Sequence, residues 1–222
     1  MKVVLFGATG MIGQGVLREC LLADDVERVL VIGRAPTERE HVKLSEIVHK
    51  DLSDLSAFEG ELTGYDACLF CLGVSSAGMS EEAYRRITYD LTLSAAGTLA
   101  KASPGITFMY VSGAGTDSTE RGRSMWARVK GKTENDLIAM DGLNAYAFRP
   151  GLIQPLHGAR SKTRLYRVAY VVMAPVLGGA RWLFPRQITT TEQIGLAMLH
   201  VARSGAPNRI LESPDIVALS SS

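Results

Sequence analysis

The most informative spacing in this sequence joins three glycines near the N-terminus. Gly7, Gly10 and Gly13 form the pattern G-x-x-G-x-x-G directly after an apolar segment of strand length, residues 2–6. Gly7 permits a sharp turn, Gly10 lets backbone N–H groups approach a pyrophosphate, and Gly13 allows a helix to pack closely on a strand. The helix that follows adds unpaired N–H groups and a positive dipole. The pattern therefore predicts a dinucleotide-binding turn made of Gly7, Ala8, Thr9, Gly10, Met11, Ile12 and Gly13.

The end of the second predicted strand bears on which dinucleotide binds. About 20 residues after such a turn, an acid normally accepts hydrogen bonds from the adenosine ribose, whereas an arginine accommodates a 2′-phosphate. Here the chain has Ile32-Gly33-Arg34, with no acid. Because a guanidinium forms bidentate, charge-assisted bonds with phosphate, Arg34 favours NADP over NAD, which stays an alternative. An arginine that only faces solvent is the other interpretation of Arg34.

Further candidate residues follow later predicted strands, at the edge where ligands bind in α/β sheets. Asp51 and Leu52 are expected beside the adenine, and a simple turn acid is the alternative for Asp51. Gly73 and Gly151 are expected to let the cofactor approach the backbone closely. Pro150 is expected to make the loop beside the nicotinamide rigid.

The elements that must position these residues alternate along the chain. Apolar runs of strand length occupy residues 2–6, 28–32, 46–49, 66–71, 107–111, 144–148 and 209–212. Their nearly continuous apolar character predicts strands that are buried on both faces. Segments with helical periodicity lie between them at 11–22, 80–102, 125–140 and 191–203. This alternation predicts a parallel sheet with helices on both faces, the doubly wound α/β or Rossmann fold.

The chain is expected to form one domain, residues 1–222, because no repeat, low-complexity tract or Pro/Ser-rich linker divides it. Its composition changes after the sixth predicted strand, where a basic stretch leads into a helix candidate rich in aromatic residues. We interpret residues 154–184 as a lid or small C-terminal substrate lobe within the domain. A plain surface helix or a dimer contact is the alternative.

Composition and charge exclude several classes of function. The chain has 222 residues, 46% of them hydrophobic, and its 24 basic and 23 acidic side chains give a net charge of +1. This balance provides no field that would favour nucleic acid or an anionic membrane. The 4 histidines lack metal-ligand spacing, so no metal site is expected. Ser112 lacks the G-x-S-x-G elbow of a hydrolase.

The cysteines and the apolar segments bear on the compartment. With 3 cysteines, an odd number, the chain fits a reducing compartment and has no disulfide framework. Cys68 and Cys71 form a C-x-x-C pattern, but their odd spacing on a strand predicts thiols on opposite faces of the core. No signal-peptide pattern precedes the first strand, and the late apolar segment 168–180 is too short to cross a bilayer. We therefore expect a cytoplasmic protein without a transmembrane segment.

Six motifs stand in a defined order along the chain. They are the glycine turn, Asp51-Leu52, Cys71-Leu72-Gly73, Tyr110-Val111-Ser112, Lys130 and Arg149-Pro150-Gly151. This set, over about residues 1–155, resembles the atypical short-chain dehydrogenases/reductases, in particular the small NAD(P)-binding, epimerase-like branch that includes the Tat-interacting oxidoreductase family. The resemblance implies an NADP(H)-binding protein with oxidoreductase activity on a small carbonyl substrate. A homodimer stays open, and no nucleic-acid partner is expected.

The resemblance also assigns catalytic positions, and one of them departs from the pattern. In the family, a serine after the fifth strand polarises the substrate, a tyrosine transfers the proton, and a lysine four residues later binds the nicotinamide ribose and lowers the tyrosine pKa. Ser112 and Lys130 match, but Trp126 occupies the tyrosine position. A phenol can be tuned to exchange a proton, whereas an indole N–H only donates a hydrogen bond and does not ionise. The usual mechanism is therefore not expected to operate unchanged.

Three interpretations remain, so the sequence leaves enzymatic activity undecided. In the first, the protein is a reductase whose proton comes from elsewhere, from an ordered water or from Tyr84, Tyr89, Tyr110 or Lys132. In the second, it binds a dinucleotide without catalysis, as a sensor or a protein-interaction module. In the third, the spacing to Lys130 is accidental, since Lys132 competes for the same role and both lysines could face solvent.

Overall fold

The computed structural model describes residues 1–159 and 187–221. Most of the segment that we interpret as a lid or lobe, residues 160–184, lies outside the described residues. No helix among the residues described is long and apolar enough to cross a membrane.

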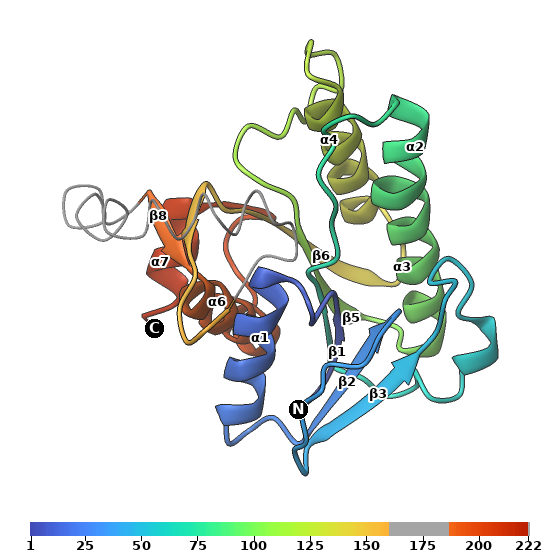
Figure 1. Cartoon of the computed structure of the whole chain (residues 1–222), viewed down its shortest axis with the longest axis vertical. Helices are drawn as coiled ribbons and strands as arrows, with labels where there is room; N and C mark the ends of the chain where they lie inside the picture. Colours follow the sequence, from blue (N-terminus) through green and yellow to red (C-terminus); the bar gives the residue numbers. More distant parts are fainter. Residues whose placement is uncertain (160–186, 222) are drawn as a thin grey trace.

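In the described part of the chain, seven parallel strands form the main sheet, in the order β3-β2-β1-β4-β5-β6-β9 (Figure 1). Their bounds are β1 (Lys2–Phe6), β2 (Arg28–Gly33), β3 (Leu44–Val48), β4 (Ala67–Phe70), β5 (Ile106–Val111), β6 (Leu143–Arg149) and β9 (Ile210–Glu212). The chain starts in the middle at β1, runs outward to β3, and returns to β4 on the other side of β1. The predicted doubly wound fold is confirmed, and its topological switch point lies between β1 and β4, where such sheets bind ligands.

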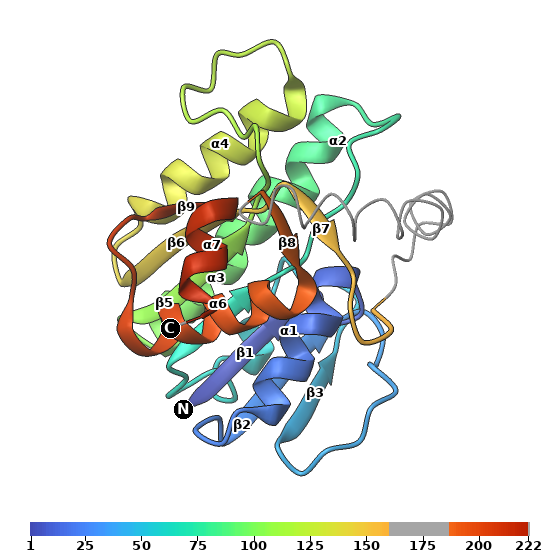
Figure 2. The same ribbon diagram turned by 90° about the vertical axis from the view of Figure 1, so that its left-hand side faces the viewer.

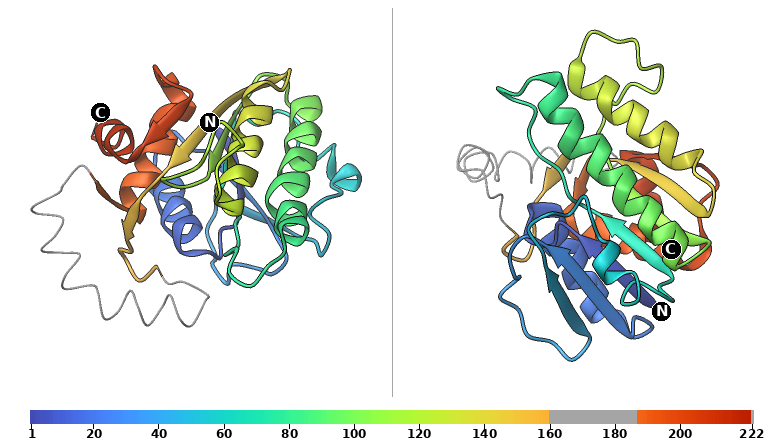
Figure 3. Two further views of the ribbon diagram at one scale, coloured as in Figure 1. Left: turned by 90° about the horizontal axis from the view of Figure 1, so that it is seen from above. Right: turned by 90° about the vertical axis from the view of Figure 1, so that its right-hand side faces the viewer.

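Helices cover both faces of the sheet, as Figures 2 and 3 show. One face carries α1 (Met11–Leu22), α6 (Thr191–Ser204) and α7 (Ser213–Leu219). The other carries α2 (Glu81–Arg85), the π-helical turn η2 (Arg86–Asp90), α3 (Leu91–Ala102) and α4 (Met125–Ile138), with the short 3-10 turn η1 (Ser56–Phe58) nearby. The sheet is therefore the middle layer of three, which explains why its strands are apolar on both sides.

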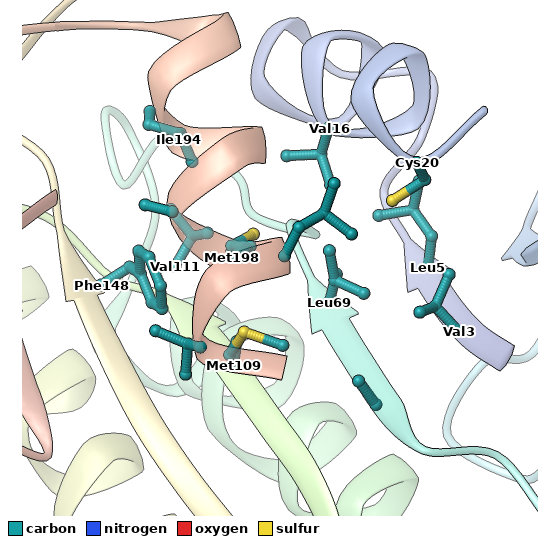
Figure 4. Close-up of a cluster of buried hydrophobic side chains, with 14 of the residues drawn as sticks. Val3, Leu5, Val16, Cys20, Leu69, Met109, Val111, Phe148, Ile194 and Met198 are labelled. Atoms are coloured by element: carbon teal, nitrogen blue, oxygen red, sulfur yellow. The ribbon is translucent and has the colours of Figure 1, made fainter. Parts of the chain in front are cut away.

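Successive residues of each strand enter different cores. Val3 and Leu5 of β1 pack with α1 and α6, and Figure 4 shows them with Val16 and Met198 of these helices. Val4 and Phe6 point to the opposite face, toward α3. Cys68 and Cys71 follow the same rule. Cys68 belongs to the core on the α3 side of the sheet, and Cys71 packs against the core on the α1 and α6 side. Both are free thiols, as predicted.

A small second sheet was not predicted from the sequence. It pairs β7 (Leu152–Gln154) with β8 (Ile188–Thr190) in parallel, and its strands are only 3 residues long. Segments this short contain less than two periods of a strand pattern, so hydrophobic periodicity cannot identify them. Thr190 then begins α6 with a capping box, in which its side chain accepts a hydrogen bond from the Gln193 N–H.

Glycines set how closely α1 and α6 approach each other. A Cβ added to Gly15 of α1 would lie 2.6 Å from the Thr191 Cβ and 2.7 Å from its carbonyl oxygen. A Cβ on Gly195 of α6 would lie 2.7 Å from the Glu19 Cγ. These two helices therefore pack closely, and the backbone of Gly15 lies against that of Thr191.

This packing makes a matched pair of substitutions informative. Gly15→Ala should lower the free energy of unfolding by about 1–3 kcal/mol, because the new methyl group meets the backbone of Thr191. Gly97→Ala, in α3, should leave stability unchanged or raise it by up to about 1 kcal/mol, because no atom lies within 4 Å of its added Cβ. Chemical denaturation measures both. Equal effects of the two substitutions would contradict the close approach.

Candidate functional site

The predicted glycine turn connects β1 to α1 and is packed against the end of β4. Gly7 has a positive φ of 78°, and a Cβ there would lie 2.6 Å from the Cys71 carbonyl carbon and the Leu72 nitrogen. A Cβ on Gly13 would lie 2.1 Å from the Gly7 oxygen. Packing inside the protein thus demands both glycines. Gly10 is different, because its added Cβ meets only the Gly7 oxygen, at 3.2 Å.

The N-terminus of α1 is arranged to receive an anion. Gly10 is the N-cap, no side chain caps the helix, and its first turn contains no acid. Because Gly10 has no Cβ, an anion can approach the backbone N–H groups of the first turn of α1. Backbone N–H groups and the positive end of the helix dipole are the usual ligands of a phosphate at such a turn.

A pocket of about 180 Å³ opens beside this turn. It lies between the turn, the end of β2 and the end of β4, and is lined by Gly7, Ala8, Thr9, Val31, Gly33, Arg34, Ala35 and Leu72. The structure therefore brings the glycine turn, Arg34 and Leu72 together, as the sequence predicted for a dinucleotide site. Val31, Gly33 and Ala35 were not predicted as site residues, although all three lie within three positions of Arg34 in the sequence.

Several predicted cofactor residues do not line this pocket, among them Asp51, Leu52 and Gly73. The Asp51 carboxylate accepts hydrogen bonds from the Ser53 N–H at 2.9 Å and the Ser53 hydroxyl at 2.6 Å, and these bonds lower its pKa. Asp51 thus forms the turn that we considered as its alternative. Leu52 is buried in the core with α3. Gly73 has no atom within 4 Å of an added Cβ, so no contact in the described structure requires a glycine there.

The second half of the site lies at the same edge of the sheet, after β5. Ser112 is buried, and its hydroxyl donates a hydrogen bond to the Phe148 carbonyl at 3.2 Å. Lys130, in α4, is part-buried and donates from its Nζ to the Ser112 carbonyl oxygen. The two predicted catalytic residues are therefore neighbours. Since β5 is separated from β1 only by β4, Ser112 lies about 10 Å from the glycine turn along the edge.

The loop after Ser112 is fixed to the end of β6. The Ala114 N–H donates to the Pro150 carbonyl at 2.9 Å, and the Gly151 N–H donates to the Ser213 hydroxyl at 2.8 Å. Trp126, one helical turn before Lys130, lies against this loop, because a Cβ on Gly115 would be 3.6 Å from its indole ring. The side chain at the tyrosine position thus faces the loop that follows Ser112.

Burial is the larger effect on Lys130 and lowers its pKa to about 8. The Glu134 carboxylate, one turn further along α4, acts in the opposite direction and raises this pKa. Glu134 is itself completely buried and binds the buried Arg149 of β6. The Arg149 Nε donates to both Glu134 oxygens, at 3.0 and 3.1 Å. Its other nitrogens reach Glu212 at 3.3 Å and the Ser118 hydroxyl at 2.5 Å. This ion pair therefore ties α4 to three other segments around the site.

Sequence reasoning missed Glu134 and the role of Arg149. The only available signal was that Glu134 follows Lys130 by one helical turn, while its partner lies in another element. The structure also separates the two competing lysines. Lys132 pairs with Asp136 at 2.8 Å and lies 5.2 Å from the centre of the Tyr89 ring, on the side of α4 that faces η2.

The chain is similar to known proteins in sequence and in fold. No protein-family model matches the chain. Protein FMP52, mitochondrial, of Saccharomyces cerevisiae is 30% identical over 176 residues, which cover 74% of this chain and 69% of that protein. The chain belongs to the FMP52 family. Protein HTATIP2 of Rattus norvegicus is a further relative, 26% identical over 154 residues, 68% of this chain and 62% of that protein. The expected resemblance to the Tat-interacting branch is confirmed by this second relative.

Solved structures similar to this FMP52-family chain have the same fold. Bordetella bronchiseptica WbmF, in complex with NAD+, gives a TM-score of 0.70 at 16% identity, over 99% of this chain and 76% of that one. The Saccharomyces cerevisiae short chain dehydrogenase/reductase YIR035C gives 0.67 at 15% identity, over 99% of this chain and 98% of that one. At these identities the likeness shows the fold.

The relatives contradict the cytoplasmic location that we expected from the sequence. FMP52 proteins of Meyerozyma guilliermondii, Debaryomyces hansenii and Saccharomyces cerevisiae carry the description mitochondrial. The expectation was wrong because it rested on cysteines and apolar segments. These patterns report on disulfides and membrane spans, and they do not distinguish one reducing compartment from another.

The buried ion pair gives a prediction with a matched surface control. Glu134→Gln should lower the free energy of unfolding by on the order of 3 kcal/mol, because it leaves the buried Arg149 guanidinium without its main counter-charge. Asp136→Asn, on the same helix, breaks the more exposed pair with Lys132 and should cost below about 1 kcal/mol. Urea denaturation compares the two. A loss in Glu134→Gln no larger than in the control would contradict the assigned role.

Proposed function

We propose that this protein binds NADP(H) and acts as an oxidoreductase on a small carbonyl substrate. The observation that carries this proposal is the pocket that joins the glycine turn, Arg34 and Leu72 at the switch point of the sheet. The residues present fit a dinucleotide in two ways. First, the absence of a Cβ at Gly10 leaves room beside the glycine turn for a phosphate group. Second, the exposed Arg34 provides a positive charge at the wall of the pocket.

The preference for NADP over NAD rests on Arg34. Its guanidinium would hold the 2′-phosphate, while the N–H groups at the start of α1 would hold the pyrophosphate. The pocket lining contains no acid that would repel this phosphate. Bound in this way, the reduced dinucleotide would supply a hydride to the substrate carbon.

The residues after β5 would hold the substrate. Ser112 offers a hydroxyl that can turn from the Phe148 carbonyl to a substrate oxygen, and Lys130 offers a cation beside it. Pro150 and Gly151 would support the nicotinamide end, since their loop is fixed to that of Ser112 through the Ala114 N–H.

One observation favours a second candidate function, a dinucleotide sensor without catalysis. Trp126 stands at the position of the proton-transferring tyrosine and contacts the loop at Gly115. An indole can stack or donate a hydrogen bond but cannot exchange a proton at accessible pH. A sensor would use the same cofactor pocket without the chemistry.

The cofactor preference is tested by calorimetric titration with NADPH and NADH. Arg34→Asp should weaken NADPH binding by on the order of 10- to 100-fold and NADH binding far less, because the lost bonds are charge-assisted bonds to the 2′-phosphate. Arg39→Asp is the control, since it removes the same charge from an exposed residue outside the pocket lining. Equal losses for both dinucleotides would refute the role of Arg34. No binding of either one at millimolar concentration by the parent would refute the proposed function.

Trp126→Tyr separates the oxidoreductase from the sensor. We expect the parent protein to reduce members of a panel of small aldehydes and ketones, measured by the loss of NADPH absorbance, and the variant to reduce them faster by on the order of 10-fold or more. If the parent binds NADPH but only the variant turns over, the sensor is the correct function. Trp126→Phe serves as the control, because it changes the size of the ring without adding an ionisable group.

A further inference from the structure

A carbonyl reductase needs a proton as well as a hydride, and the source of that proton is not obvious here. This inference rests on the proposed oxidoreductase function. The position that usually supplies the proton holds Trp126, whose indole does not ionise. The source must therefore be sought among the other groups near Ser112.

The three tyrosines considered from the sequence are poor sources. Tyr84 and Tyr110 are buried in the core, and burial raises the pKa of both phenols. The Tyr89 hydroxyl donates a hydrogen bond to the Asp136 carboxylate, and this bond raises the pKa of Tyr89. These phenols therefore hold their protons at neutral pH, and in the described part of the chain the side-chain hydrogen bonds at Ser112 join it to Phe148 and Lys130.

Lys132 is also a poor source. It is bound to Asp136, and this hydrogen bond raises its pKa. Residues two apart on an α-helix differ by about 200° in direction, so Lys132 and Lys130 point to different sides of α4. Lys132 accordingly lines the pocket near Tyr89 and Arg85, away from Ser112.

Lys130 has the geometry that the other candidates lack. Its Nζ lies at the Ser112 carbonyl oxygen, at the edge of the sheet where the substrate would bind. An ammonium group has three N–H donors and a flexible stem, so one bond to Ser112 leaves two donors for a substrate oxygen. Because burial lowers its pKa to about 8, the ammonium is also a better acid than a solvent-exposed lysine.

Within the described part of the chain, the charge that acts on Lys130 comes from one carboxylate. On its own helix, the Glu134 carboxylate raises the Lys130 pKa. From β6, the Arg149 guanidinium pairs with Glu134 and so offsets much of the negative charge of this carboxylate. From β5, the buried phenol of Tyr110 is hydrogen-bonded to Thr133 of α4 and interacts with Tyr84 of α2, and burial raises the pKa of both phenols, so they stay neutral. From η2, Tyr89 belongs to the pair with Asp136 on the other side of α4.

We propose that Lys130 is the proton donor of the reaction, in place of the missing tyrosine. The carbonyl carbon of the substrate accepts the hydride that the reduced nicotinamide dinucleotide supplies, and the carbonyl π-bond breaks toward oxygen. That oxygen takes a proton from the Lys130 Nζ, which becomes a neutral amine. The products are an alcohol and the oxidised dinucleotide, and the amine regains a proton from solvent. In the reverse direction, the neutral amine accepts the proton of the alcohol.

The first test is the pH profile of the parent protein. The rate constant of carbonyl reduction should be level below about pH 8 and fall tenfold per pH unit above it, because only the protonated Lys130 can act. Alcohol oxidation should show the opposite dependence. A reduction rate that stays level from pH 7 to about 9.5 would overturn the inference.

The second test is Lys130→Arg. The guanidinium keeps the positive charge but does not release a proton near neutral pH. We expect the variant still to bind NADPH by calorimetry, because the positive charge is kept, and kcat/KM at pH 7 to fall on the order of 10²- to 10⁴-fold. Lys132→Arg is the matched control and should change kcat/KM by less than about twofold, because Lys132 faces away from the site. Turnover retained in Lys130→Arg would overturn the inference.

A third measurement does not depend on turnover. Competitive labelling of the parent with trace acetic anhydride at several pH values, read by mass spectrometry, gives the pKa of each lysine separately. Lys130 should become reactive near pH 8 and be protected by NADP+, whereas Lys132 should react only at higher pH. A Lys130 that titrates together with Lys132 would overturn the inference, even if Lys130→Arg does not fold.

The outcomes also distinguish the inference from the function on which it rests. If the parent binds no dinucleotide, the proposed function itself fails. If the parent binds NADPH but reduces none of the carbonyl panel, the role of Lys130 as proton donor is refuted and the cofactor site stands. If Lys130→Arg binds NADPH and loses turnover while Lys132→Arg keeps it, the inference is supported.

Discussion

The contact of Gly13 with the Gly7 carbonyl is the constraint on which the rest of this structure depends. There the first turn of α1 touches the turn that leaves β1, and Gly7 in turn touches the backbone between Cys71 and Leu72. Two strands and a helix thus meet without an intervening side chain. This close approach places the N-terminus of α1 directly above the sheet edge and brings Leu72 and Arg34 to one pocket.

A second interaction holds the other half of the site. The buried pair of Arg149 and Glu134 joins β6 to α4, and through Ser118 it also holds the loop before α4. Glu134 lies one turn from Lys130, so this pair fixes the helix face that meets Ser112. A buried ion pair is seldom a large source of stability, but removal of one partner is costly. Its effect here is to fix the position of α4 relative to the sheet.

Much of the frame was predictable, because its signals are local. The bounds of β1 and α1 agree with the predicted segments 2–6 and 11–22, since a buried strand and a glycine turn both have strong sequence patterns. The third strand was predicted at 46–49 but runs over Leu44–Val48, because the edge strand is less apolar than the central ones. The three-residue strands β7 and β8 carry too little pattern to be found.

The site could be predicted only in part, because its remaining features depend on contacts between distant residues. The turn and Arg34 were found from spacing, but the partnership of Glu134 with Arg149 joins two elements. The sequence suggested an adenine contact or a turn for Asp51, and the structure shows that its Oδ1 accepts both hydrogen bonds from Ser53. The two lysines could not be ranked by sequence, whereas helical geometry places only Lys130 at Ser112.

The most direct test of this account is a crystal structure of the protein grown with saturating NADP+. The account predicts the pyrophosphate at the N-terminus of α1 over Gly10, the 2′-phosphate in contact with Arg34, and the nicotinamide ring at the edge beside Ser112 and Lys130. A dinucleotide bound elsewhere, or clear density for the protein with none at the glycine turn, would contradict it.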